Sequence, residues 1–355
     1  MMTDDSECFS ADPVINRFLI LQKHNVGLQL ATVRKYGRFL DRLTAWLLTL
    51  QPPCAVLKAN AEMLEQWTGL ELHRAKLLPQ TRRIAIIAVR GFYHWAKEAG
   101  LIESNPAEHL PSPKCGSPLP KPAQLQHAQS LIMAPNLNTF VGLRDAAMLA
   151  VLIGTGCRVS GLVALNEGDL IWTQPSKNKT ERLSIRLCEK GKKERIVPCP
   201  METGLFIRAY LGHDRIDQLS RLLPNGDRVL FVNQCNSQVR EHERFGERMR
   251  IRADSFGAIL KKYGKDQGVP NKVLHPHAFR HLFATELAEE DVDLLVRQAL
   301  LGHADPASTS LYTQLAIRKL FDTVDRANPL GKIRTPVSDL ANAMRAAERA
   351  ARNKG

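Results

Sequence analysis

The chain has 355 residues, of which 44% are apolar, and this size predicts about two domains. A formal net charge of +13 and a pI near 9.6 indicate a polyanionic partner, most often nucleic acid, with a generic basic surface or an anionic membrane surface as the alternatives. The longest apolar run, 146–154, is too short to span a bilayer, and the acidic N-terminus lacks the features of a signal peptide. Seven irregularly spaced cysteines argue against a disulfide framework. We therefore expect a cytoplasmic protein.

The first hundred residues carry apolar side chains at helical intervals over 12–50 and 62–100. Basic residues decorate the remaining faces, and this pattern predicts a small N-terminal helical bundle over 12–104. A proline-rich segment without periodicity follows at 105–121 and predicts an extended linker. The arginines of the second helical stretch are the candidate DNA contacts of this bundle: Arg82, Arg83 and Arg90.

A second domain is predicted over 122–321. It begins with a buried helix at 143–156, and the alternation of apolar and polar residues over 182–200 predicts a β-hairpin with a basic tip. Residues 223–252 are charged and irregular. The fold is therefore expected to be mainly α with a small β-hairpin or sheet, an α+β class, with further helices at 201–222, 253–264, 276–289 and 292–300.

The C-terminal tail, 322–355, contains a break and then a helix. Two prolines and a glycine within 326–336 predict that this segment does not pack tightly against its own domain. The helix over 336–352 has a narrow apolar stripe made of Val337, Leu340 and Met344. A helix of this length needs a docking surface to be stable, so it is either a solvated tail or a segment that docks on a neighbouring protomer.

Chemically active residues recur in four short stretches of the second domain. Each has an ordinary structural explanation by itself, such as a surface arginine, a turn lysine or a packed tyrosine. Together they fit phosphoryl transfer at a phosphodiester: arginine forks bind the non-bridging oxygens, a tyrosine attacks phosphorus, a histidine helps remove its proton, and a lysine protonates the departing oxygen. The residues are Arg158, Lys190, His277, Arg280, His303 and Tyr312.

Metal and nucleotide chemistry have no matching pattern in the sequence. No carboxylate cluster of the kind that holds magnesium is present, and no GxxxxGK[ST] loop occurs. We therefore expect no metal and no other cofactor. Cys188 and Cys199 fall where they face each other across the hairpin, and without a second ligand pair they are interpreted as buried hydrophobes.

The ordered motifs TGCRVSGL, EKGKKERIVP, HPHAFRHLFAT, LLGH and STSLYTQ resemble the tyrosine recombinase (phage integrase) family, with Xer-type members nearest. The resemblance covers most of 122–321, and the N-terminal bundle resembles the SAM-like core-binding domain of that family. It implies five catalytic residues, Arg158, Lys190, His277, Arg280 and His303, with Tyr312 as the nucleophile. Lys192 and Lys193 at the hairpin tip are further candidate DNA contacts.

The same resemblance implies a reaction and its partners. The family cuts and rejoins DNA strands through a 3′-phosphotyrosine bond, without ATP or metal. The implied partner is a double-stranded DNA recombination site. Two such sites would be bound by a tetramer, made of this chain alone or of this chain with a related recombinase. Accessory DNA-bending proteins are a further candidate partner class, no membrane partner is expected, and the location would be the nucleoid.

One motif departs from the family pattern. Gly161 stands where the family usually has a glutamate that positions neighbouring groups, and Glu167 is a candidate to compensate. Two alternatives therefore stay open: a non-catalytic DNA-binding protein, and a metal-independent phosphodiesterase with His277 and His303 as acid and base. A type IB topoisomerase shares the tyrosine chemistry. The long 223–252 segment favours a mobile-element role over chromosome dimer resolution.

Overall fold

The computed structural model describes residues 8–116, 123–174, 180–189, 193–233, 239–302 and 314–352. The chain divides into two compact units, Met1–Pro118 and Leu119–Gly355, and each unit has its own hydrophobic core. The division falls inside the segment expected to be a linker. Within the ranges described, no helix combines the length and the apolar character needed to cross a membrane.

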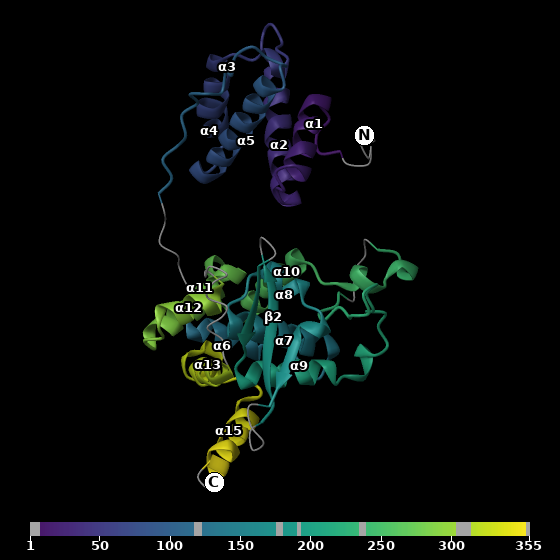
Figure 1. Ribbon diagram of the computed structural model, residues 1–355, viewed down its shortest axis with the longest axis vertical. Helices are drawn as coiled ribbons and strands as arrows, with labels where there is room; N and C mark the ends of the chain where they lie inside the picture. Colours follow the sequence, from purple (N-terminus) through teal and green to yellow (C-terminus); the bar gives the residue numbers. More distant parts are fainter. Residues whose placement is uncertain are drawn as a thin grey trace. The chain divides into compact units, whose positions relative to one another are not determined.

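The N-terminal unit is a helical bundle (Figure 1). The periodic stretch 12–50 forms two helices, which are separated by a turn with Gly27 in the left-handed conformation at φ 72°. Asp12 caps the first helix by accepting from the backbone N–H groups of Val14 and Ile15. The helices are α1 (Pro13–His24), α2 (Leu30–Leu47), α3 (Ala61–Gln66), α4 (Leu72–Arg74) and α5 (Pro79–Glu98).

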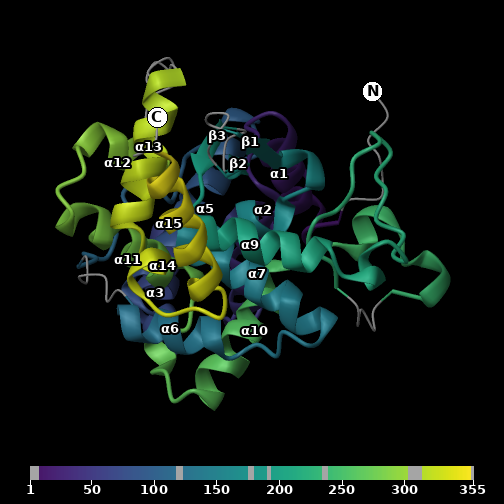
Figure 2. The same cartoon turned by 90° about the horizontal axis from the view of Figure 1, so that it is seen from below.

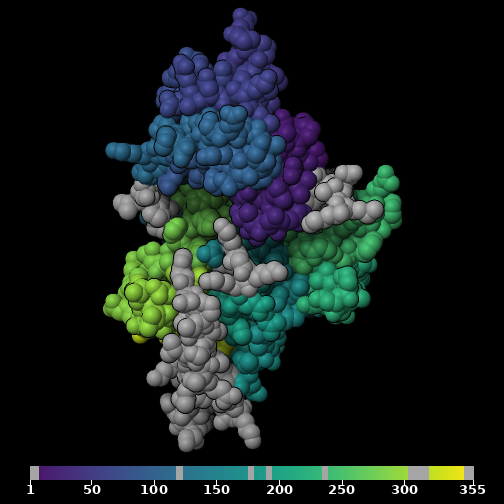
Figure 3. All heavy atoms as spheres, turned by 45° about the horizontal axis from the view of Figure 1, so that its top comes forward, coloured from purple at the N-terminus to yellow at the C-terminus, as the bar shows by residue number. Residues whose placement is uncertain are grey.

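Aromatic side chains fill the core of this bundle. Phe18 of α1 packs edge-on against Phe92 of α5 with ring centroids 5.7 Å apart, and Trp67 is buried in the same core cluster. The space-filling view shows the atoms of α1 to α5 as one continuous mass around this core (Figure 3). The periodicity read from the sequence is confirmed by the burial of Leu40 and Leu43, on the inner face of α2.

The second unit is built around the buried helix α7 (Phe140–Thr155), which lies among the other helices in both views (Figures 1 and 2). Nearly every α7 side chain is buried, as the continuous apolar run predicts. The fold class is confirmed: the unit is mainly helical with one small sheet. The surrounding helices are α6 (Leu125–Met133), α8 (Val159–Ala164), α9 (Met201–Leu211), α10 (Ala253–Asp266), α11 (Pro276–Glu289), α12 (Leu294–Leu301), α13 (Gln314–Ala327), α14 (Pro329–Lys332) and α15 (Ser338–Arg352).

The sheet has three antiparallel strands in the order β1-β2-β3. The predicted hairpin is confirmed as β2 (Arg182–Glu189) and β3 (Lys193–Pro198), and the sequence missed β1 (Leu170–Thr173). Cys188 lies opposite Glu194 and is exposed, whereas Cys199 is buried beyond the end of β3. The expectation that the two cysteines face each other and are both buried is therefore wrong, because the register pairs Cys188 with a different residue.

The helix expected over 201–222 ends at Leu211, so that expectation is wrong at its C-terminal end. Gly212 terminates the helix, and arginine side chains hold the irregular segments that follow it. Arg221 donates to the carbonyl of Val229 at 2.9 Å, and Arg250 donates to the carbonyl of Leu165 at 3.0 Å. Charge-assisted bonds from arginine to backbone carbonyls allow an irregular segment to pack without leaving those carbonyls unsatisfied.

The C-terminal segment packs on its own unit, contrary to the sequence-based expectation. Asn328 and Leu330 are fully buried, and Thr335 is 3% exposed. The expected apolar stripe is wrong at Leu340, which is 55% exposed. Val337 does pack against the core of the unit, and α15 buries Ala341. The boundary expected after residue 321 falls inside α13, whose Val324 and Ala327 belong to the core of the second unit.

Candidate active site

Arg158 stands where α7 ends and α8 begins. Gly156 terminates α7 in the left-handed conformation, at φ 57°, and Arg158 is the N-cap residue of α8. A Cβ on Gly156 would lie 2.6 Å from a ring carbon of Phe283, so only glycine fits between α7 and α11. The placement of Arg158 predicted from the sequence, after a glycine-rich helix end, is confirmed.

Arg280 lies on α11, one turn after the start of the helix. His275 caps α11 by accepting from the N–H of Ala278, and Pro276 occupies the first turn, where its fixed φ suits the helix. The Arg280 side chain is buried and donates to the carbonyl of Gly156 at 2.7 Å and to the carbonyl of Leu301. The two ends of the guanidinium group therefore join α7, α11 and α12 at the site.

His277 extends from the same helix to an exposed position. Partial burial of the ring lowers the pKa of His277 below the ordinary value of 6.5. The positive charges of Arg280, His275, His281 and Arg158 lower the same pKa further, which places both arginines within electrostatic reach of the imidazole. A neutral imidazole accepts a proton, as the predicted role requires.

Three predicted site residues lie outside the described residues: Lys190, His303 and Tyr312. Lys192 also lies outside them, and Lys193 is the first residue of β3. The neighbouring elements are described. Lys190 follows the end of β2, His303 follows Gly302 at the end of α12, and Tyr312 precedes α13 by two residues.

A residue that the sequence analysis did not single out, Arg195 of β3, holds the end of α12. Its guanidinium donates to the carbonyl of Leu300, next to the carbonyl of Leu301 that accepts from Arg280. Gly302 then ends the helix at φ 72°, and a Cβ there would lie 3.0 Å from Arg195. Two arginines thus bind the last carbonyls before His303. The alternating pattern of the strand places Arg195 on one face of the hairpin, but it does not predict the contact with Leu300.

The four tyrosines other than Tyr312 lie within the described residues, and burial raises the pKa of each. Three of their hydroxyls donate to specific acceptors. Tyr93 donates to the carbonyl of Val56 at 2.6 Å, Tyr210 to the carbonyl of Leu230 at 2.9 Å, and Tyr263 to Asp145 at 3.0 Å. A raised pKa disfavours the phenolate, so these tyrosines are poorly suited to attack phosphorus.

Gly161, the departure from the family pattern, is buried in α8. The carboxylate of Glu167 pairs with Arg221 at 2.7 Å and with Arg228 at 3.6 Å, and neither arginine is among the predicted catalytic residues. These contacts give Glu167 a structural role in the 221–229 loop. They do not support the compensation expected of it. The parts of the chain that are described contain no group of three His, Cys, Asp or Glu side chains that could hold a metal ion.

The arginines predicted to bind DNA lie on α5 of the N-terminal unit. Arg83 is exposed, and Arg82 and Arg90 are half-buried. The guanidinium of Arg90 donates to the carbonyl of Leu110, which ties the start of the proline-rich segment to the bundle. Arg90 therefore has a structural contact beside its predicted role.

Residues 124–318 match the phage integrase family. The chain belongs to the phage integrase family of tyrosine recombinases. It is 34% identical over 244 residues to tyrosine recombinase XerC of Thermodesulfovibrio yellowstonii, which covers 69% of this chain and 74% of that relative. It is 33% identical over 325 residues to tyrosine recombinase XerD of Pseudomonas aeruginosa, which covers 90% of this chain and 98% of that relative. This chain is therefore a Xer-like tyrosine recombinase.

The fold of this recombinase is similar to that of a solved XerH site-specific recombinase bound to a palindromic difH substrate. The two share 17% sequence identity with a TM-score of 0.58, over 88% of this chain and 84% of the XerH chain. At this identity the similarity supports the two-domain fold, and it does not identify site residues.

Proposed function

We propose that this chain is a site-specific DNA recombinase that cuts and rejoins strands through a covalent 3′-phosphotyrosine intermediate on Tyr312. The observation that carries the proposal is the convergence of Arg158, His277 and Arg280 at the junction of α7, α8 and α11. Two permanent positive charges beside a neutral imidazole suit a phosphodiester, because they stabilise negative charge on its non-bridging oxygens.

The reaction can be written with its atoms balanced. The Tyr312 hydroxyl oxygen attacks phosphorus, His277 accepts its proton, and a phosphotyrosine bond forms to the 3′ end of the strand. The bond between phosphorus and the 5′ oxygen breaks, and Lys190 donates a proton to that oxygen. Rejoining is the reverse reaction with a 5′ hydroxyl from the partner strand. Because one phosphodiester is exchanged for another phosphate ester, no ATP is needed, and the arginines supply the charge that a metal would otherwise contribute.

The proposed partner is a double-stranded DNA recombination site. The formal net charge of +13 favours a polyanion, and basic residues of α5, including Arg82 and Arg83, are proposed phosphate contacts in the N-terminal unit. Both strands of two sites must be exchanged, so the proposed active assembly is a tetramer of this chain, alone or with a related recombinase.

Covalent capture tests the proposal. The full-length protein is incubated with sheared DNA from its native genome, and adducts are separated on a denaturing gel. The expected result is protein joined to a DNA 3′ end, with the joined ends clustering at one sequence. Cleavage without an adduct would instead support the phosphodiesterase, and binding without cleavage would support a non-catalytic DNA-binding protein. Either of these results rejects the proposed function.

A further inference from the structure

A buried arginine joins the sheet to α13, the helix that follows Tyr312. Arg182 is the first residue of β2, and its side chain is 7% exposed. Its Nη1 donates to Oδ2 of Asp325 at 2.8 Å, and its Nη2 donates to Oδ1 of the same residue at 2.6 Å. Two parallel bonds between a guanidinium and a carboxylate fix the relative orientation of the groups as well as their distance.

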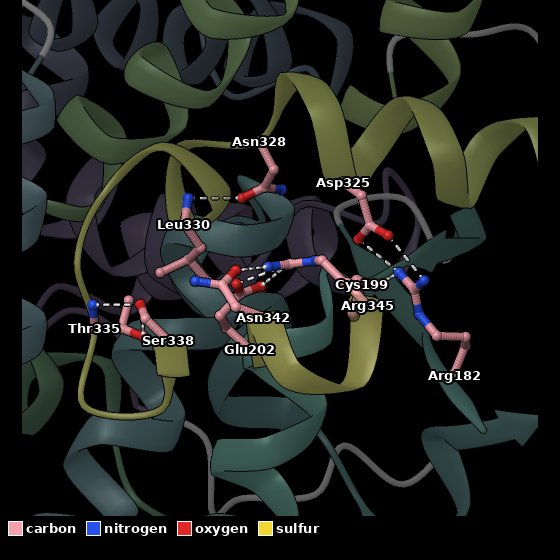
Figure 4. A network of polar contacts seen from close by, with 10 residues as sticks. All are labelled: Arg182, Cys199, Glu202, Asp325, Asn328, Leu330, Thr335, Ser338, Asn342 and Arg345. Carbon is pink, nitrogen blue, oxygen red and sulfur yellow. Dashed lines mark hydrogen bonds and ion pairs between the residues drawn. The ribbon is translucent and has the colours of Figure 1, made fainter. Parts of the chain in front are cut away.

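Arg182 contacts α13 at a second turn. The centre of its guanidinium lies 4.7 Å from the ring centroid of Phe321, and Phe321 is 3% exposed. Phe321 and Asp325 are four residues apart, so they lie on one face of α13. Figure 4 shows Arg182 and Asp325 pointing toward one another from the strand and the helix. Contacts at two successive turns restrain rotation of α13 as well as its position.

The end of α13 is held to two further elements of the site. The buried side chain of Asn328 donates to the carbonyl of Gly154, at the end of α7, at 2.7 Å. Lys332 of α14 pairs with Glu286 and Glu290, at the end of α11, at 2.8 Å each. Together with Arg182, these contacts bind the segment after Tyr312 to three elements of the site. They are α7, which precedes Arg158; α11, which contains Arg280; and β2, which precedes Lys190.

We infer that Arg182 and Asp325 are positioning residues for Tyr312 of the same chain, an inference that rests on the proposed function. Asp325 lies about 16 Å along the helix axis from Gln314, at 1.5 Å per residue. A helix is stiff over this length, so a rotation permitted at Asp325 displaces the end that leads to Tyr312. The nucleophile must stand in line with the bond that breaks, and a misplacement of 1 Å lowers a rate by about 10²-fold.

The first experiment measures covalent adduct formation on a nicked synthetic duplex that carries the site mapped by covalent capture. Asp325→Asn removes the negative charge of the pair, and Arg182→Gln removes the positive charge. We expect each to bind a half-site within about twofold of wild type and to form the adduct about 10²-fold more slowly. Arg182→Lys keeps the charge but loses the fork, and its rate should lie between those of wild type and Arg182→Gln.

Arg208 of α9, which packs on the same sheet, provides a matched control. It also pairs with a carboxylate, that of Glu181, and its guanidinium lies 4.2 Å from the ring centroid of Trp172. Its described contacts do not include α13. Arg208→Gln should therefore form the adduct at the wild-type rate, whereas a general loss of arginine contacts at the sheet would slow it as well.

A second experiment separates the nucleophile from the leaving-group acid. Sulfur in place of the bridging 5′ oxygen leaves without a proton, because the pKa of a thiol, about 8.5, is far below that of an alcohol. This substrate should restore adduct formation to Lys190→Ala. It should not restore Asp325→Asn, because that variant misplaces the attacking oxygen.

Three results would overturn the inference: a wild-type rate for Asp325→Asn, restoration of Asp325→Asn by the sulfur substrate, or a rate loss that matches the loss of folded protein measured by thermal unfolding. A wild-type protein that forms no adduct is a different result, because it rejects the proposed function, and with it the positioning role, before any variant is compared.

Discussion

At the scale of single residues, the raised pKa values of the other four tyrosines support the proposal that Tyr312 is the nucleophile. We predict that Tyr312→Phe keeps its affinity for DNA, because Lys and Arg supply the phosphate contacts, and forms no covalent adduct. The measurement is a mobility-shift assay beside a denaturing gel. Tyr36→Phe, in the half-buried tyrosine of α2, is the control and should retain adduct formation. Cleavage by Tyr312→Phe would show that the nucleophile is another group.

As the proposed proton acceptor, His277 should set the acidic limit of the reaction through its lowered pKa. Because the imidazole must be neutral to accept a proton, the acidic midpoint of the cleavage rate should lie below pH 6.5, the ordinary pKa of histidine. His281→Gln removes one of the neighbouring positive charges, so it should raise the pKa of His277 and move the acidic limit to higher pH. NMR titration of the imidazole and the pH dependence of adduct formation both measure the shift. An acidic limit above pH 6.5 in the wild type would contradict this account.

At the scale of secondary-structure elements, the junction of α7 and α8 depends on Gly156. We predict that Gly156→Ala lowers the free energy of unfolding by at least about 1–3 kcal/mol, because alanine is strained at positive φ. The added Cβ also meets Phe283 of α11, so the variant should lose adduct formation through displacement of Arg158 and Arg280. Thermal unfolding and adduct assays measure the two effects.

Gly226 is the matched control for Gly156. It also has a positive φ, of 83°, but no atom lies within 4 Å of the position of a Cβ. Gly226→Ala should show the strain of a positive φ alone and keep adduct formation. If both variants behave alike, the contact of Gly156 with α11 has no special role in the site.

The sequence predicted those elements whose signals are local. The helix over 276–289 was expected with its bounds, because Pro276 and the apolar spacing of Phe279, Phe283 and Leu287 define one buried face. The first strand was missed because the four residues of β1 are stabilised by pairing with β2 rather than by a pattern of their own.

Contacts between distant parts of the chain were not predictable from sequence. The expectation that the segment after α13 stays loose failed because its partners lie far away in the chain. Asn328 binds the carbonyl of Gly154, 174 positions earlier, and Asp325 binds Arg182, 143 positions earlier. Prolines and glycines describe the local backbone, but such side-chain contacts decide whether a segment packs.

An ion pair with a buried partner holds α15 on α9. Arg345 donates to both carboxylate oxygens of Glu202 on α9, at 2.6 and 2.7 Å, and the Glu202 side chain is 2% exposed (Figure 4). The proposal that this helix is donated to a neighbouring protomer gives Glu202 a second role, as the acceptor of the helix from the neighbour. A buried carboxylate without its arginine would be strongly unfavourable. Glu202 should therefore always be paired with an Arg345, either from its own chain or from a neighbouring protomer.

We predict that deleting residues 338–355 spares the binding of one protomer to a half-site but reduces cooperative filling of two half-sites and recombination. Glu202→Gln keeps the helix and weakens its acceptor, so it should reduce cooperativity in the same way. Titrations of single and paired half-sites on native gels measure both effects. Full cooperativity in the deletion variant would mean that α15 acts only within its own chain.

At the scale of the whole molecule, each unit has a hydrophobic core of its own. The aromatic cluster of the N-terminal unit and the core around α7 share no residue, and the division between the units falls in the proline-rich segment. The start of the segment expected to be an extended linker packs on the N-terminal unit instead, because Ala107 and Leu110 are buried in its core. We propose that both units contact the duplex and clamp it between them. The proposal of such a clamp therefore concerns binding, and it leaves the chemistry to the second unit.

We predict that residues 119–355 alone bind DNA much more weakly than the full chain and with a shallower dependence on salt. Each phosphate neutralised by Lys or Arg releases counterions and adds about 0.9 to the slope of log K against log salt. The exposed arginines of α2 and α5, such as Arg38 and Arg83, should supply part of that slope, so Arg83→Gln in the full chain should lower it slightly. Affinity measured from 50 to 200 mM salt compares the proteins. Equal affinity and equal slope for the full chain and the second unit would contradict the clamp, because the N-terminal unit would then add no phosphate contact.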